Sequence, residues 1–306
     1  MVELHFAPLQ GYTDCLYRNL HDEIFGGVGA YYTPFIRIEH GELRKKDIRD
    51  VLPENDKTGK LIPQVIVKDV HELEFLVSAL QEMGYCRIDI NMGCPFPLQT
   101  KKGRGAGLLS NFEKVGKICE FINNQSEIDF SIKMRLGNTD VGDYMHLLPI
   151  LNDTRLKHVT IHPRIATQQY KGELNMDAFD EIIMNCTKPL IYNGELCSVE
   201  DIEDIVKRYP ALKGVMMGRG LLMRPTLAKE YISGESVSTD ELLRKVMEFH
   251  NRIFDGYSNV LQGDSHLLMK MKTFWEYLEG VIGHKNYKLI KKAVSISKYN
   301  AVLSNI

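Results

Sequence analysis

The stretch that decides the fold reads Arg87-Ile88-Asp89-Ile90-Asn91-Met92-Gly93-Cys94-Pro95. Its alternating isoleucines are typical of a buried strand, and Gly93 is expected to end that strand. Pro95 stiffens the chain directly after the turn. The pattern therefore predicts a core strand that presents the thiol of Cys94 on a short, rigid loop. A lone cysteine is also often a small buried hydrophobe, and this structural alternative stays open for Cys94 at this point.

Short apolar segments like this one recur along the chain, separated by stretches with helical spacing such as 70–83 and 199–208. The eight predicted strands are 4–8, 30–36, 61–67, 86–91, 130–134, 158–162, 189–192 and 214–217. Eight such units within about 230 residues match a (β/α)8 TIM barrel, which typically takes ~250. An open doubly wound sheet is the alternative, but it normally has a glycine-rich turn after its first strand. In this chain the glycine-rich turns follow the seventh and eighth predicted strands instead.

The strand pattern stops after Pro225, and a polar connector at 233–238 follows it. Thr239-Asp240-Glu241 is typical of a helix start, with Thr239 or Asp240 as the cap. The prediction is an α/β protein: a catalytic TIM barrel over residues 1–234, followed by a small all-helical C-terminal domain over residues 235–306.

Composition narrows the class of protein. The chain has 306 residues, 44% hydrophobic and 25% charged, which is ordinary for a soluble globular protein, and no apolar run is long enough to cross a bilayer. Its six cysteines form no Cys-x-x-Cys pair and no His-rich metal spacing, so we expect reduced thiols, no metal site and a cytoplasmic protein. The formal net charge is −2, but residues 265–306 carry seven Lys and two Glu, which indicates a basic C-terminal face.

Polar residues follow nearly every predicted strand, and in a barrel these strand ends meet at one mouth. They are Gln64, Asn91, Cys94, Lys133, Arg135, His162, Arg164, Asn193-Gly194-Glu195 and Gly218-Arg219-Gly220. The last two groups lie where TIM barrels commonly bind phosphate. Lys133 needs a polar partner, either Asp89 or a cofactor ring that becomes negative on reduction. His162 is either a core histidine or a cofactor contact.

Taken together, these residues resemble the dihydrouridine synthases, flavoenzymes that reduce specific uridines in transfer RNA. The motifs that carry the resemblance are Asn91-Met92-Gly93-Cys94-Pro95 with Gly105-Ala106, then 7–14, 133–137, 168–172, Asn193-Gly194 and Gly218-Arg219. Lys270-x-Lys272 and the aromatic stretch after it are similar to the dihydrouridine synthase C subgroup. The loop 96–100 and Ile165-Ala166 depart from the family pattern.

The resemblance implies a set of roles. The residues that would hold FMN are Pro8, Leu9, Gln10, Gln64, Lys133, His162, Asn193, Gly194, Glu195, Gly218 and Arg219. Cys94 would give a proton to C5 of uracil after a hydride from flavin N5 reaches C6, and NADPH would re-reduce the flavin. Asn91 would orient the uracil, which must flip out of the RNA stack. Arg104, Arg135, Arg164, Lys270 and Lys272 would contact the tRNA. We expect a monomer with no obligate protein partner.

Two other functions fit part of this pattern. A different FMN barrel that acts on a small molecule, such as a dihydropyrimidine or dihydroorotate dehydrogenase, would share the late phosphate turns and Lys133. It would not need a Lys-rich helical appendage. An RNA-binding module without turnover would have no use for an intact Cys94 and Lys133.

Overall fold

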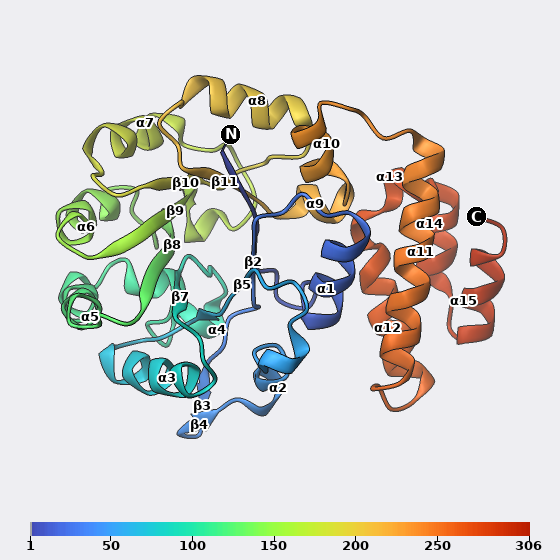
Figure 1. Cartoon of the computed structure of the whole chain (residues 1–306), viewed down its shortest axis with the longest axis horizontal. Coiled ribbons are helices and arrows are strands. Elements are labelled where there is room, and N and C mark those ends of the chain that lie inside the picture. The colour runs from blue at the N-terminus through green and yellow to red at the C-terminus, as the bar shows by residue number, and fades with distance from the viewer. Residues whose placement is uncertain (1) are drawn as a thin grey trace.

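The centre of the protein is a closed barrel of parallel strands, seen in the computed structural model, which describes residues 2–306 (Figure 1). The strands are β1 Glu3–Phe6, β2 Ala30–Tyr32, β5 Leu61–Ile62, β6 Gln64–Val65, β7 Arg87–Met92, β8 Asp129–Gly137, β9 Leu156–Ile165, β10 Leu190–Tyr192 and β11 Gly214–Met217. They follow the order β5-β2-β1-β11-β10-β9-β8-β7-β6. Only Pro63, which has no N–H to donate, separates β5 from β6, so the two ends of the order adjoin. The predicted TIM barrel is confirmed.

Helices surround the barrel, as Figure 1 shows. They are α1 Cys15–Ile24, α2 Lys45–Ile48, α3 Val70–Glu82, α4 Pro97–Thr100, α5 Phe112–Asn123, α6 Asp143–Asn152, α7 Met176–Asn185, α8 Val199–Arg208, α9 Arg219–Met223 and α10 Leu227–Ser233. Both helices predicted by spacing, 70–83 and 199–208, are confirmed. Their starts are capped locally: Asp69 accepts a hydrogen bond from the Glu72 N–H, and Ser198 forms a capping box with Asp201.

The chain ends in helices that group beside α1 and α9 (Figure 1). They are α11 Thr239–Ser258, α12 Asp264–Phe274, α13 Glu279–Ile282, α14 His284–Lys292 and α15 Ile296–Leu303. Trp275 is fully buried among them and donates to the Tyr299 hydroxyl at 2.7 Å. One detail of the prediction is wrong: the cap of α11 is Ser238, whose side chain accepts from the Glu241 N–H, and not Thr239 or Asp240.

Polar contacts join these helices to the loop after β1. The Tyr257 hydroxyl donates to Asp14 at 2.8 Å, and Lys270 Nζ lies 3.1 Å from the same carboxylate. Lys270 also donates to the Gly11 carbonyl at 2.8 Å. The side chain of Lys270 is therefore engaged in this junction.

The interior of the barrel is filled toward the amino ends of its strands. Tyr32 connects two buried histidines there, with its hydroxyl 2.9 Å from His5 Nδ1 and 3.3 Å from His158 Nε2. The open space is left at the carboxyl ends, where the loops meet. A small hairpin that the sequence did not predict, β3 Ile38–Glu39 with β4 Glu42–Leu43, lies beside this mouth. Within residues 2–306 no helix combines the length and the apolar character needed to span a membrane.

Candidate active site

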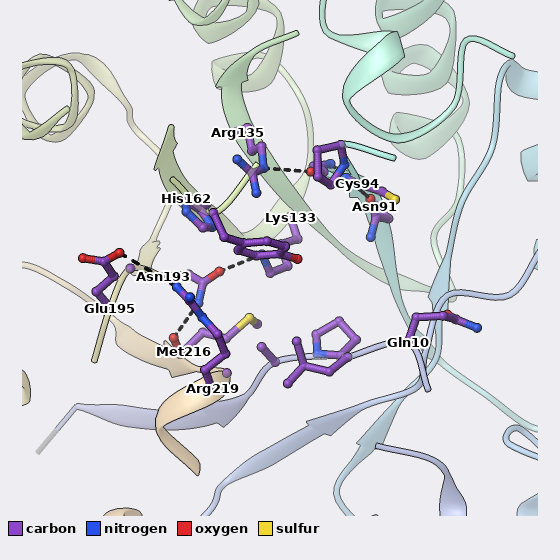
Figure 2. A pocket seen from close by; sticks show the side chains of 18 of the residues that line it. Gln10, Asn91, Cys94, Lys133, Arg135, His162, Asn193, Glu195, Met216 and Arg219 are labelled. Carbon is purple, nitrogen blue, oxygen red and sulfur yellow. Dashed lines mark hydrogen bonds and ion pairs between the residues drawn. The ribbon is translucent and has the colours of Figure 1, made fainter. Parts of the chain in front are cut away.

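A cavity opens at the carboxyl ends of the strands and collects side chains from most of the loops around the mouth. Figure 2 shows Asn91 and Cys94 at one end, Glu195 and Arg219 at the other, and Lys133 and Asn193 between them. Of the predicted site residues, those that line the cavity are Pro8, Leu9, Gln10, Asn91, Cys94, Lys133, Arg135, His162, Asn193, Gly194, Glu195, Gly218 and Arg219. The structure therefore brings together most of the set that the sequence predicts.

At one end of the cavity, Asn91 holds the loop that carries the thiol. Its Oδ1 accepts hydrogen bonds from the backbone N–H groups of Gly93 at 3.1 Å and Cys94 at 2.8 Å. Arg135 supports the same turn because its Nε donates to the Gly93 carbonyl at 3.0 Å. The amide oxygen of Asn91 is thus committed to positioning Cys94, a task that the sequence analysis did not assign to it.

A buried chain of hydrogen bonds lies behind Asn91. Asn91 donates to Gln64 Oε1 at 2.8 Å, Gln64 donates to Asp89 at 2.7 Å, and Ser131 donates to the other Asp89 oxygen at 2.5 Å. Burial raises the pKa of Asp89 to about 6. Gln64 is fully buried and is not among the residues that line the cavity, so its side chain supports Asn91 from behind.

The backbone of Gly105 and Ala106 also passes very close to Cys94. Ala106 N–H donates to the Cys94 carbonyl at 3.1 Å, which closes the loop at its neck. Gly105 has φ +57°, and a Cβ atom there would lie 2.8 Å from Cys94 Cβ and from its carbonyl oxygen. Only glycine fits this close approach without moving the thiol residue.

Cys94 is 7% exposed, and burial raises the pKa of its thiol above the ordinary value. The backbone of Phe96, and after it the charges of Arg135 and Lys133, oppose this shift without cancelling it. The thiol is therefore protonated at neutral pH, which is the form that can donate a proton.

Positive charge dominates the centre of the cavity. Lys133 Nζ donates to Asn193 Oδ1 at 2.7 Å, and Asn193 in turn donates to the Met216 carbonyl at 2.7 Å. The Lys133 ammonium thus pairs with Asn193, whereas the Asp89 carboxylate, its alternative partner, accepts from Ser131 and Gln64. Burial lowers the pKa of Lys133 to about 8. Burial, with Arg135 as the strongest of the surrounding cations, lowers the pKa of His162 well below its usual value, so this imidazole is neutral.

At the far end, Glu195 lies between two arginines. Its carboxylate is 2.5 Å from Arg164, which is 1% exposed, and 3.9 Å from Arg219. Arg164 also donates to the Gly172 carbonyl at 2.6 Å, so its guanidinium is held behind the cavity wall. Glu195 is the only carboxylate among the residues that line the cavity, and the lining keeps an excess of cations.

Besides Arg164, three predicted RNA contacts lie outside the cavity: Arg104, Lys270 and Lys272, whose binding roles stay predictions. Arg104 is 7% exposed and forms a two-point ion pair with Glu72, through Nε at 2.9 Å and Nη2 at 2.5 Å. This ion pair fixes the guanidinium beside Glu72, and a contact of Arg104 with RNA stays a prediction. Lys270 lies in the junction with Asp14, while Lys272 lines a separate groove between α12 and α14.

Several cavity residues were not predicted. The most informative is Tyr170, with the guanidinium carbons of Arg135 and Arg219 at 5.4 Å and 5.2 Å from the centre of its ring. Its place in the Gln168-Gln169-Tyr170-Lys171-Gly172 motif was the signal that could have identified it. The others are Ala7, Phe35, Gly93, Pro95, Phe96, Leu196, Cys197 and Met216, while Gly220 belongs to the predicted turn after the eighth strand. No group of three or more His, Cys, Asp or Glu side chains in residues 2–306 is arranged to hold a metal ion.

The sequence of the chain is similar to those of known proteins. Residues 5–304 match the family model described as dihydrouridine synthase. A tRNA-dihydrouridine(16) synthase of Neisseria meningitidis is 28% identical over 242 residues, 76% of this chain and 72% of its own length. A probable tRNA-dihydrouridine synthase of Staphylococcus epidermidis is 24% identical, covering 90% and 85%.

Other relatives are much longer proteins. A tRNA-dihydrouridine(47) synthase [NAD(P)(+)]-like protein of Xenopus laevis is 30% identical over 184 residues, and the match spans 58% of this chain but only 28% of that protein. The chain thus matches little more than a quarter of that relative.

Solved structures share the architecture. The old yellow enzyme from Trypanosoma cruzi superposes with a TM-score of 0.51 at 9% identity, over 77% of this chain and 89% of that one. A 2-naphthoyl-CoA reductase gives 0.55 at 9% identity, over 78% and 51%. At such low identity these likenesses establish the barrel fold.

Proposed function

The chain belongs to the dihydrouridine synthase family, and from this premise we propose that it reduces the C5–C6 double bond of specific uridines in tRNA with FMN as its cofactor. One observation carries the proposal: a protonated thiol, that of Cys94, and a cluster of cations around Lys133 face the same cavity. A reduction of uracil needs an acid beside one carbon and a hydride source beside the next. The subgroup, by similarity to dihydrouridine synthase C, stays a prediction.

The cavity fits a flavin phosphate and ring by its charge. Lys133, Arg135 and Arg219 face it, while its one carboxylate, Glu195, is already paired with Arg164. This surplus of cations suits a dianionic phosphate and a ring that gains negative charge. The residues that would hold FMN are Pro8, Leu9, Gln10, Lys133, His162, Asn193, Gly194, Glu195, Gly218 and Arg219, with Gln64 acting indirectly through Asn91.

When bound, FMN supplies a hydride for C6 of uracil, and NADPH is the proposed source of its electrons. Cys94 holds the proton that C5 requires, and its thiolate forms as the C5–H bond forms. Asn91 and Arg135 fix the thiol in place through the backbone of the loop. Lys133 stays charged at neutral pH because its lowered pKa of about 8 still lies above 7.

The proposed partner is tRNA, bound by the monomeric protein. The proposed division of labour is a catalytic barrel over residues 1–234 and an RNA-binding helical region over 235–306. Lys272 and Lys291 line one groove of that region. Because the proposed substrate is tRNA, we propose that the protein acts in the cytoplasm.

The test is direct. The purified protein should be yellow, release FMN on denaturation, and form dihydrouridine when it is mixed with NADPH and tRNA that lacks the modification. A parallel reaction with NADH measures the preference between the two donors. A flavin-bearing protein that oxidises NADPH but leaves every uridine in tRNA intact would favour a small-molecule reductase instead.

A further inference from the structure

Two apolar side chains on the Cys94 loop are not explained by packing. Phe96 is 51% exposed and Leu98 is 79% exposed, although both lie within four residues of the thiol. Scattered apolar residues are common on protein surfaces. These two differ because Phe96 lines the cavity that contains Cys94, and Leu98 lines the neighbouring groove. Phe96 and Leu98 thus form an apolar rim between the cavity and the groove.

The backbone presents Phe96 rigidly. Pro95 and Pro97 flank it, and a residue that precedes a proline is restricted to extended conformations, as Phe96 is at φ −68° and ψ 129°. Its carbonyl accepts the N–H groups of Gln99 at 2.8 Å and Thr100 at 3.1 Å. A ring held on such a loop loses little backbone freedom when it contacts a partner.

Polar groups beside this rim match the chemistry of RNA. Lys101 and Lys102 follow α4 and are exposed, whereas Lys68, across the groove, lies 3.5 Å from the Glu72 carboxylate. Exposed cations suit the phosphates of RNA.

We propose that Phe96 stacks on the base next to the reduced uridine, while Leu98, Lys101 and Lys102 follow the same RNA strand away from the cavity. This inference rests on the proposed function. A uridine that leaves its stack exposes the face of its neighbour, and an aromatic ring at the rim of the cavity covers that face. Because every base has such a face, Phe96 contributes affinity and positioning without selecting a base.

The experiment compares Phe96→Ala, Phe96→Leu and Phe96→Tyr with the native protein in steady-state and single-turnover reactions on unmodified tRNA. Met184→Ala is the matched control, because Met184 is 74% exposed on α7, on an outer helix of the barrel. We expect Phe96→Ala to raise KM for tRNA roughly tenfold, as the loss of one stacked base predicts. Phe96→Leu should raise KM by nearly as much, because it also lacks an aromatic ring. Phe96→Tyr, which keeps the ring, should have the native KM. Bound flavin and its reduction by NADPH should be unchanged in all variants.

Two results would overturn the inference. Either Phe96→Ala keeps the native KM and turnover, or Phe96→Leu restores them fully, which would show that any apolar group suffices. Should Phe96→Ala fail to fold, the Leu and Tyr variants decide between these outcomes. A native protein that forms no dihydrouridine at all overturns the proposed function, which is a distinct result.

Discussion

The cavity and the C-terminal helices are built on opposite principles. In the cavity, polar side chains such as the buried Asn91 and the half-buried Lys133 are fixed by hydrogen bonds to other side chains. On the C-terminal helices, most lysines are exposed and the structure fixes few of them, Lys270 being the exception. The difference teaches that the chemistry depends on a few exact placements, whereas the proposed RNA binding depends on many loosely placed charges. Substitutions should have large effects in the first region and small, salt-dependent effects in the second.

The largest effect is expected for Cys94→Ala. Removing a general acid typically costs about 10²–10⁴-fold in rate, so dihydrouridine formation should fall by that order while FMN stays bound. Single-turnover rates and flavin absorbance measure the two quantities. Cys86→Ala, an exposed cysteine outside the cavity, is the control and should behave as the native protein. Near-native turnover by Cys94→Ala would show that the thiol is not the proton donor. The expected difference between large effects in the cavity and small effects on the helices would then be wrong.

Arg104→Ala should produce the largest loss of stability. It removes the two-point partner of the buried Glu72 carboxylate and leaves it only Lys68 Nζ at 3.5 Å, so we expect a cost at the lower end for a broken buried pair, about 3 kcal/mol of unfolding free energy. Denaturant unfolding measures this loss. The double variant Arg104→Leu, Glu72→Leu removes both charges and should recover much of it. If Arg104→Ala instead leaves stability intact and weakens tRNA binding, the original prediction of an RNA contact was right.

The pH dependence should reveal the acid. Cys94 donates only when protonated, and its pKa is raised, so its contribution is constant across neutral pH. The contribution of the thiol to the single-turnover rate of the pre-reduced enzyme, measured with saturating FMN, should fall only as pH rises past the ordinary thiol range, by about tenfold per pH unit above the pKa. Lys133 loses its charge earlier, around its pKa of about 8. A rate that already falls between pH 6 and 7, below both groups, would mean that the thiol ionises too easily to act as this acid.

The smallest effect is expected on the helices. Lys272→Ala with Lys291→Ala should weaken tRNA binding a few-fold at low salt and reduce the salt slope by about 1.5, in keeping with two lost phosphate contacts. Lys207→Ala, an exposed lysine on α8, is the control. Binding titrations over a salt series measure both the affinity for tRNA and its salt slope. An unchanged slope would separate the helical region from RNA binding.

The sequence predicted the barrel well because each strand is a local apolar signal, and the late glycine turns do line the cavity. It also predicted most of the cavity lining, because strand ends converge wherever a barrel closes. It could not show that Arg104 pairs with Glu72, 32 residues away, or that Lys270 belongs to the junction. Such pairings depend on how distant segments pack, and a basic residue has the same local pattern whether it is buried or free.

The contact between Gly105 and Cys94 has a use beyond this protein. Because a single methyl group at position 105 would collide with the thiol residue, that glycine serves as a marker for the geometry of the Cys94 loop. A related gene that retains the cysteine but encodes a larger residue there must, by this criterion, have a reshaped loop. Genome surveys can apply the test without any structure.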